Sequence, residues 1–242
     1  MTDRILAADV PVGDHIVWKI GGLSFNVDTI LGTLIACAIL IVFGLWVRAK
    51  ASSGVPKGPQ LLFETVTSNV ERQVEATLGI RTAPFVVPVS IVLFFFILTV
   101  NWLSIIPTGH HPEYLPPPAS DVNLTYPLAF LVIIWMHVTG VRKKGFRGYY
   151  RHLAQPYAWL FPFNLIEEIA RPFTLALRLF GNVFSGVIMV SLIALFPAYI
   201  LWAPNSIWKL FELFIGLIQA FIFALLTIIY FGSVAPDEEG AH

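Results

Sequence analysis

The stretch Glu167–Gly186 reads Glu-Glu-Ile-Ala-Arg-Pro-Phe-Thr-Leu-Ala-Leu-Arg-Leu-Phe-Gly-Asn-Val-Phe-Ser-Gly, and the interpretation of the chain starts from it. It leads into an apolar run, because no charged residue follows Arg178 until Lys209. Arg178 therefore lies in a segment that is typical of a membrane helix. A charged side chain at the centre of a bilayer costs about 2.5–3.5 kcal/mol on insertion scales, so such a charge indicates a functional site.

Polar residues of this stretch recur at the spacing of one helical face, and the positions between them are mostly apolar. They are Arg171, Thr174, Arg178, Asn182 and Ser185. A polar stripe on a membrane helix faces a cavity or a partner and not lipid. The alternative is an arginine whose side chain snorkels to the headgroups. That alternative stays open for Arg171, whereas the long apolar run before Pro197 argues against it for Arg178.

The composition is that of a polytopic membrane protein. Of the 242 residues 57% are hydrophobic and 12% charged, and the mean hydropathy is +0.76, whereas soluble domains carry about 25% charged residues. The single cysteine, Cys37, excludes an internal disulfide and a thiolate metal cluster. No carboxylates converge on His110 and His111, so we expect no metal site. We also expect no cofactor and no nucleic-acid partner. Residues 1–25 lack an apolar core and are expected to form an external N-terminal segment, not a signal peptide.

We expect an all-α fold with five transmembrane helices in a single membrane domain, 1–242. The expected spans are 26–47, 84–106, 121–141, 163–196 and 206–231. Residues 59–79 combine apolar positions at helical spacing with charged residues, which favours an amphipathic helix at the interface. The last two spans should form a long tilted antiparallel hairpin, with Pro172 bending the first of them. Asp121 is expected to cap the third span, and Asn205 or Ser206 the fifth.

The distribution of lysine and arginine predicts the topology. Residues 48–83 and 142–163 carry five each, and all five of the second group lie in an expected basic loop, 142–151, while 107–120 and 197–205 carry none. Because basic loops stay in the cytoplasm, the N-terminus is expected outside and the tail 232–242 inside.

Depth along the last two helices orders their polar residues. At about 1.5 Å per residue from the outer end, Glu212 lies about 9 Å deep, Gln219 and Asn182 about 20 Å, and Arg178 about 27 Å. Asn182 and Gln219 are therefore placed to meet across the pair. For Asn182 and Gln219, the alternative to a functional role is an interhelical hydrogen bond that only packs the helices. For Glu212, the alternative is an acid near the helix start that is favoured by the helix dipole.

This order suggests an ion path that a fixed positive charge interrupts. A carboxylate carries a proton, and amides order water, but arginine does not release its proton in a protein. On the inner side Glu168, Arg171 and Thr174 continue the stripe. A path blocked in its middle transports nothing alone and needs a moving carrier of opposite charge.

The same residues resemble the a subunit of rotary ATP synthases, the membrane stator. Leu177–Asn182 (LRLFGN) and Gln219–Thr227 (QAFIFALLT) are similar to its two signature helices. Three shorter segments are similar to its other motifs, and the resemblance covers residues 60 to 232 in all. These segments are Asn101–Pro107, Asp121–Asn123 and Asn164–Glu168.

The resemblance implies a subunit that binds no nucleotide and provides two offset proton half-channels beside a rotating ring of c subunits. Its setting would be the ATP synthase complex, with b-type peripheral stalk subunits and membrane lipid around it, in a bacterial inner (plasma) membrane. Arg178 would face the ring carboxylate. The outer half-channel would be lined by Asn182, Glu212 and Gln219, with Asn101 and Asp121 near its mouth. The inner one would be lined by Glu168 and Thr174.

One position departs from the family pattern. Many members carry an acid at the position of Val187 and a histidine where this chain has Glu212, so the acid here is on the facing helix. A secondary transporter that binds an anionic substrate at Arg178 is the alternative function. It predicts broken helices and repeated halves, which the sequence does not contain. A purely structural membrane anchor would leave the arginine stripe unexplained.

The topology is tested by cysteine labelling of intact cells at Ala119→Cys and Ala241→Cys. An impermeant reagent should label position 119 and not position 241. The reverse pattern would invert the assignment.

Overall fold

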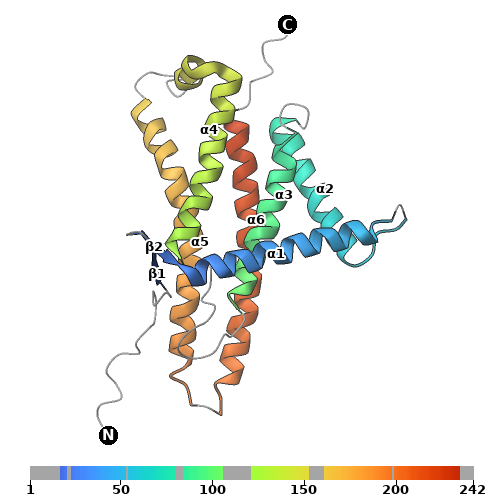
Figure 1. Ribbon diagram of the computed structural model, residues 1–242, viewed down its shortest axis with the longest axis vertical. Coiled ribbons are helices and arrows are strands. Elements are labelled where there is room, and N and C mark those ends of the chain that lie inside the picture. The colour runs from blue at the N-terminus through green and yellow to red at the C-terminus, as the bar shows by residue number, and fades with distance from the viewer. Residues whose placement is uncertain are drawn as a thin grey trace.

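The computed structural model describes residues 17–20, 23–52, 54–79, 84–105, 121–152, 161–197 and 199–234 (Figure 1). Five helices in these ranges, all except α2, are long and apolar enough to cross a membrane, which confirms the all-α polytopic fold. In chain order the elements are β1 (Val17–Ile20), β2 (Leu23–Asn26), α1 (Val27–Lys50), α2 (Pro59–Leu78), α3 (Val86–Leu103), α4 (Val122–His152), α5 (Phe161–Ile193) and α6 (Trp202–Val234). The expected residues His110 and His111 lie outside the described ranges.

A short β-hairpin precedes the first membrane helix, which the all-helical expectation did not include. β1 and β2 are antiparallel, with Val17 opposite Asn26 and Ile20 opposite Leu23. The intervening sequence is Gly21-Gly22, a pair that two-residue hairpin loops favour. Strands this short are easily missed because four residues give little periodicity.

The amphipathic helix α2 lies where it was expected. Pro59 occupies its first turn, a position where the missing N–H costs nothing, and Gly58 and Gly79 flank it with positive φ angles of 59° and 70°. Val70 and Val74 are buried against the core. The charged side chains of α2 lie on its exposed side.

Two boundary predictions were wrong. The segment 142–151, expected as a basic loop, is helical and belongs to α4, because lysine and arginine favour helices. Gly145, at φ 71° and ψ 156°, is not helical, so α4 consists of two helical stretches joined by a kink at this residue. α6 begins at Trp202, so neither Asn205 nor Ser206 is its cap. Pro204 lies in its first turn, where proline is tolerated.

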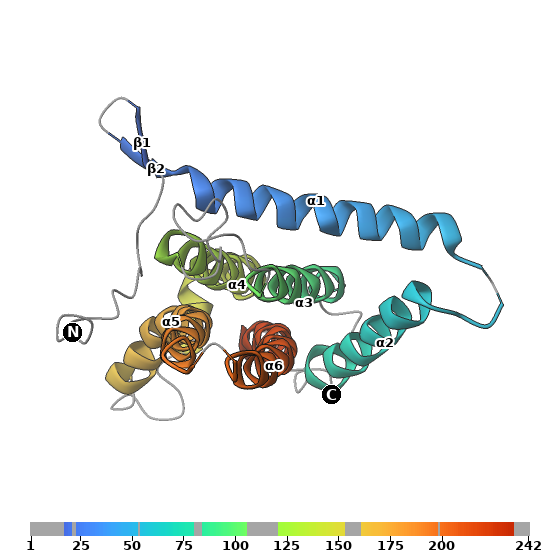
Figure 2. The same cartoon turned by 90° about the horizontal axis from the view of Figure 1, so that it is seen from below.

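α1 runs across the direction of the other membrane helices. In Figure 2, α3, α4, α5 and α6 are seen nearly end-on, whereas α1 lies lengthwise beside α3 and α4. α5 and α6 have 33 residues each, which makes each about 50 Å long against about 30 Å for the hydrocarbon core. The antiparallel pair must therefore tilt to keep its apolar length in the membrane.

α6 occupies the centre of the helix packing. It contacts α2, α3, α4 and α5, and its most extensive contact is with α3. Gly216, Ala220 and Ala224 recur at every fourth position of α6 and are all buried. Small residues at this spacing let helix backbones approach closely, which is how helices associate in lipid. α5 packs mainly on α4 and touches α6 over a smaller area.

Candidate functional site

Arg178 lies on an exposed face of α5. Leu175 and Leu179, on the packed side of the helix, are each 1% exposed, whereas Thr174, Arg178 and Ser185 are exposed. Within the described residues no hydrogen bond or ion pair reaches the Arg178 guanidinium. A permanent positive charge is thus presented outward from the bundle, where only a partner, water or lipid can face it.

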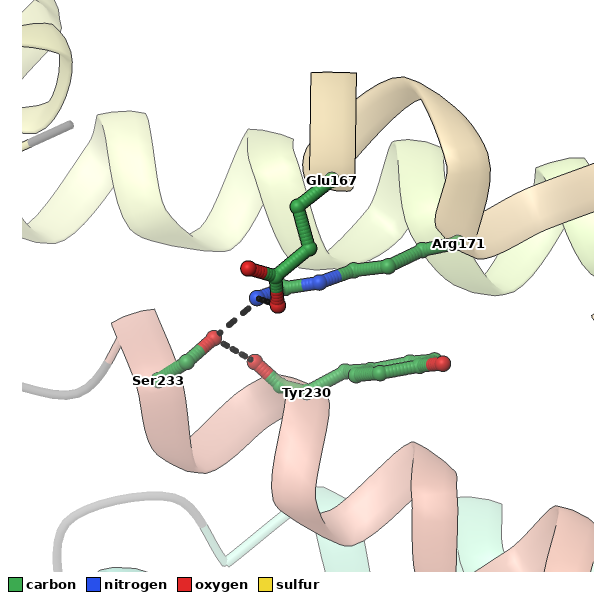
Figure 3. Close-up of polar contacts among 4 residues, drawn as sticks. All are labelled: Glu167, Arg171, Tyr230 and Ser233. Carbon is green, nitrogen blue, oxygen red and sulfur yellow. Dashed lines mark hydrogen bonds and ion pairs between the residues drawn. The ribbon is translucent and has the colours of Figure 1, made fainter. Parts of the chain in front are cut away.

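Arg171, two turns earlier on α5, is instead held against α6 (Figure 3). Its guanidinium donates to Glu167 Oε1 at 3.3 Å and to Ser233 Oγ at 3.5 Å. Its guanidinium carbon lies 5.2 Å from the centroid of the Tyr230 ring, within cation–π range. The Arg171 side chain is only 19% exposed. It therefore bridges the two helices and does not snorkel.

Glu212 on α6 is fixed by two donors from its own helix. Trp208 Nε1 donates to Oε1 and Lys209 Nζ donates to Oε2, each at 3.0 Å, and the lysine contact is an ion pair. The Glu212 side chain is 19% exposed. The carboxylate is thus partly shielded from solvent and balanced by a neighbouring charge.

The carboxylate of Glu212 is pressed against α5 at Gly186. A Cβ added to Gly186 would lie 2.5 Å from Glu212 Oε1, so the missing side chain makes room for the acid. Because α5 and α6 are antiparallel, residues level with each other are found by counting equal steps from this contact, backward along α5 and forward along α6. Four steps bring Asn182 level with Gly216. Gln219 comes level with Leu179, next to Arg178 and about one turn deeper than expected. The earlier start of α6 at Trp202 explains the shift.

Buried amides without partners lie where α6 meets α3. A Cβ added to Gly216 would lie 3.1 Å from the Cβ of Asn101, and Gln219 follows three residues later. Both amides are 5% exposed, and Asn101 Nδ2, Asn101 Oδ1 and Gln219 Nε2 have no hydrogen-bond partner within the described residues. Burying such groups unsatisfied costs about 1–3 kcal/mol each. They are therefore suited to bind water.

The remaining expected residues lie apart from this region or outside the described side chains. Asp121 precedes α4 and is 3% exposed, and its carboxylate contacts α1. The Thr174 hydroxyl donates to the carbonyl oxygen of Ala170 at 2.9 Å. Glu168 belongs to α5, but its side chain is not among those described.

Three neighbours of the acid were not among the expected site residues. Lys209 and Trp208 precede Glu212 by three and four positions, the spacing at which helical side chains meet, so the sequence contained that signal. Gly186 carried no comparable signal, because its closeness to Glu212 depends on how α5 and α6 pair.

Comparison with known proteins matches the sequence of this chain to one family. The family model described as ATP synthase A chain matches residues 30–232. The chain belongs to the ATP synthase A chain family. ATP synthase subunit a of Acidothermus cellulolyticus is 52% identical over 239 residues, which cover 98% of this chain and 88% of the relative. ATP synthase subunit a of Mycobacterium marinum is 48% identical over 250 residues, and the alignment covers both chains fully. ATP synthase subunit a of Desulforamulus reducens is 34% identical over 230 residues, which cover 93% of this chain and 86% of the relative.

Membership in the ATP synthase A chain family confirms the resemblance carried by LRLFGN and by Gln219–Thr227. An ATP synthase A chain is a multi-pass subunit of the membrane sector and is not itself catalytic. It works within the ATP synthase complex beside the c-subunit ring and the b-type stalk, so the expected partners are confirmed. The assignment favours the stator role over a secondary transporter.

Gly186→Ala tests the contact between α5 and the acid. The new methyl group should push the flexible Glu212 side chain away from α5, with a loss of stability of about 1 kcal/mol. ATP-driven proton pumping should fall severalfold while the complex still assembles. Gly44→Ala is the matched control, because a Cβ there meets no atom within 4 Å and Gly44 lies on α1, away from this contact. Normal pumping in Gly186→Ala would show that the position of the carboxylate is unimportant.

Proposed function

We propose that this chain supplies both proton half-channels of the stator and that Arg178 faces the carboxylate of the rotating c ring. The observation that carries the proposal is the outward-facing guanidinium of Arg178, which no side chain of the described residues pairs. In lipid such a charge is costly, and a ring carboxylate that passes this face is the partner of opposite sign. Thr174 and Ser185, on either side of Arg178 along the chain, extend a polar strip on the same exposed side of α5.

The outer half-channel is proposed to run along the seam between α5 and α6. Glu212 lies nearest the connecting turn and exchanges protons with the outside, and its contact with Gly186 points it at α5. Asn182, Gln219 and Asn101 lie deeper, and their amides bind the water that carries the proton onward. Asp121 is proposed near the mouth, as the resemblance implies.

The inner half-channel is proposed on the cytoplasmic side of Arg178, with Glu168 and Thr174 along it. The Arg171 bridge to Tyr230 supports this, because it holds α5 and α6 at a fixed spacing at that end. The basic residues of α4 support a cytoplasmic position for the same end of the bundle and an external N-terminus.

The arginine couples proton flow to rotation by excluding a direct path. A ring carboxylate must be neutral while it faces lipid, since a bare charge there is prohibitively costly. Next to Arg178 the opposite charge lowers the pKa of the ring carboxyl and favours proton release. The emptied carboxylate can be reloaded only from the other half-channel, and the membrane potential drives each charge with about 2.3 kcal/mol per 100 mV. Net flow therefore requires the ring to turn.

Arg178→Lys and Arg178→Ala test the central charge. Lysine keeps a charge but loses the rigid fork and can deprotonate, so both variants should lose ATP synthesis, and Arg178→Ala should open a passive proton leak. The measurement is ATP synthesis in vesicles under an imposed pH gradient, with assembly checked in parallel. Near-normal synthesis in Arg178→Ala would refute the proposal.

The role of the acid is tested by moving it across the seam. Glu212→Gly should slow ATP-driven proton pumping severalfold. Adding Gly186→Glu should restore part of the rate, because the carboxylate then enters the same space from α5. Lys209→Gln is a separate variant that removes only the ion pair. If Glu212→Gly alone pumps at the parental rate, Glu212 is not the titratable group of the outer half-channel.

A further inference from the structure

α1 is attached to the rest of the protein by polar contacts at both of its ends. At its start, the Asp121 carboxylate accepts hydrogen bonds from Asn26 Nδ2 at 2.8 Å and from the Thr29 hydroxyl. Just beyond its end, the Gln60 amide of α2 donates to the Ser52 carbonyl oxygen at 3.0 Å and accepts from the Ser52 backbone N–H at 3.3 Å. Asp121 and Gln60 are both buried.

Between these two attachments α1 packs only lightly. Of the residues in its apolar window 17% are buried, chiefly the small residues Gly32 and Ala36 that lie closest to the bundle. Phe43 adds a ring contact with Phe95 of α3, at 5.3 Å between centroids. Apolar side chains gain little by leaving lipid for protein, so close packing and polar contacts decide whether membrane helices associate. The polar ends are therefore the main attachments of α1.

The attachment at Asp121 joins two parts of the bundle. α1 packs along α3, and Asp121 directly precedes α4. α3 packs on α6 and α4 packs on α5, while α3 and α4 touch each other little within the described residues. The contact between α1 and Asp121 is therefore a link between the pair α3–α6 and the pair α4–α5. The two pairs also meet directly, because α6 packs against both α4 and α5, and the seam between α5 and α6 is one part of that boundary.

We propose that Asp121, Asn26 and Thr29 form a latch that docks α1 across α3 and α4 and thereby acts together with the α4–α6 and α5–α6 contacts to fix the width of the α5–α6 seam. The Asp121 carboxylate accepts from the side chain of Asn26, which directly precedes α1, from the Thr29 hydroxyl of α1, and from the backbone N–H of Asn123 at 2.8 Å. A carboxylate that is buried and surrounded by donors is an anchor for a neighbouring helix. Asp121 is thus a positioning residue. The inference rests on the proposed function in one respect, that protons move along this seam.

Thr29→Val is the first test, because it removes a donor to Asp121 while leaving the Asp121 carboxylate in the chain. Loss of one interhelical hydrogen bond shifts the docked-to-undocked ratio of α1 about threefold, and ATP-driven proton pumping should fall with it. Thr33→Val is the matched control, since its hydroxyl donates within α1 to the Thr29 carbonyl oxygen at 2.7 Å. Pumping in Thr29→Val that equals that of Thr33→Val would overturn the latch.

The second test replaces the latch by a covalent link. Asn26→Cys and Asp121→Cys are combined with Cys37→Ala and joined by a short bis-methanethiosulfonate linker, which dithiothreitol releases. Pumping should be low with free thiols and recover when the linker is present. If the linker restores nothing while Asp121→Glu does, the carboxylate itself is required and the latch is refuted. Arg178→Ala in the same vesicles reports separately on the proposed proton path.

Discussion

The architecture depends on one constraint, the cost of leaving a permanent positive charge in a bilayer. Arg178 cannot lose its proton, so its surroundings must supply negative charge or water. The bundle meets this constraint by packing against the side of α5 that is opposite Arg178. Leu175 and Leu179 face the bundle, and the guanidinium is left on the outer surface. A stator needs such a surface, because the partner charge arrives on another subunit and must be able to leave again.

Two neighbouring arginines on one helix have opposite environments. Arg171 is bound to Glu167, Ser233 and the Tyr230 ring, so it contributes to the attachment of α5 to α6. Arg178, two turns further along, has no such partner within the described residues. The difference follows from which face of α5 meets α6 at each level. It separates a charge that holds the two helices together from one that, in the proposed function, acts on the ring.

The periodicity of apolar residues was enough to predict the spans, the amphipathic α2 and the polar face of α5, since these depend on residues close in sequence. The β-hairpin and the helical continuation through 142–151 were missed because short strands and charged helices lack an apolar period. The pairing of Glu212 with Gly186 and the contacts of Asp121 with α1 could not be predicted. Both join residues far apart in the sequence, and a shift of three residues in the α5–α6 register changes every partner.

The excess length of α5 has a geometric consequence for coupling. The apolar span of α5 has 25 residues, about 38 Å, which exceeds a core about 30 Å thick, so the helix moves sideways as it crosses. Gly186 beside the acid and Arg171 at the far bridge are 15 residues apart on this helix, or about 22 Å, and part of that distance is parallel to the membrane plane. Two channel openings at different depths along such a tilted helix are displaced from each other parallel to the membrane plane, without any further structural element. A proton entering at one and leaving at the other must be carried laterally, and lateral transport past a fixed subunit is rotation.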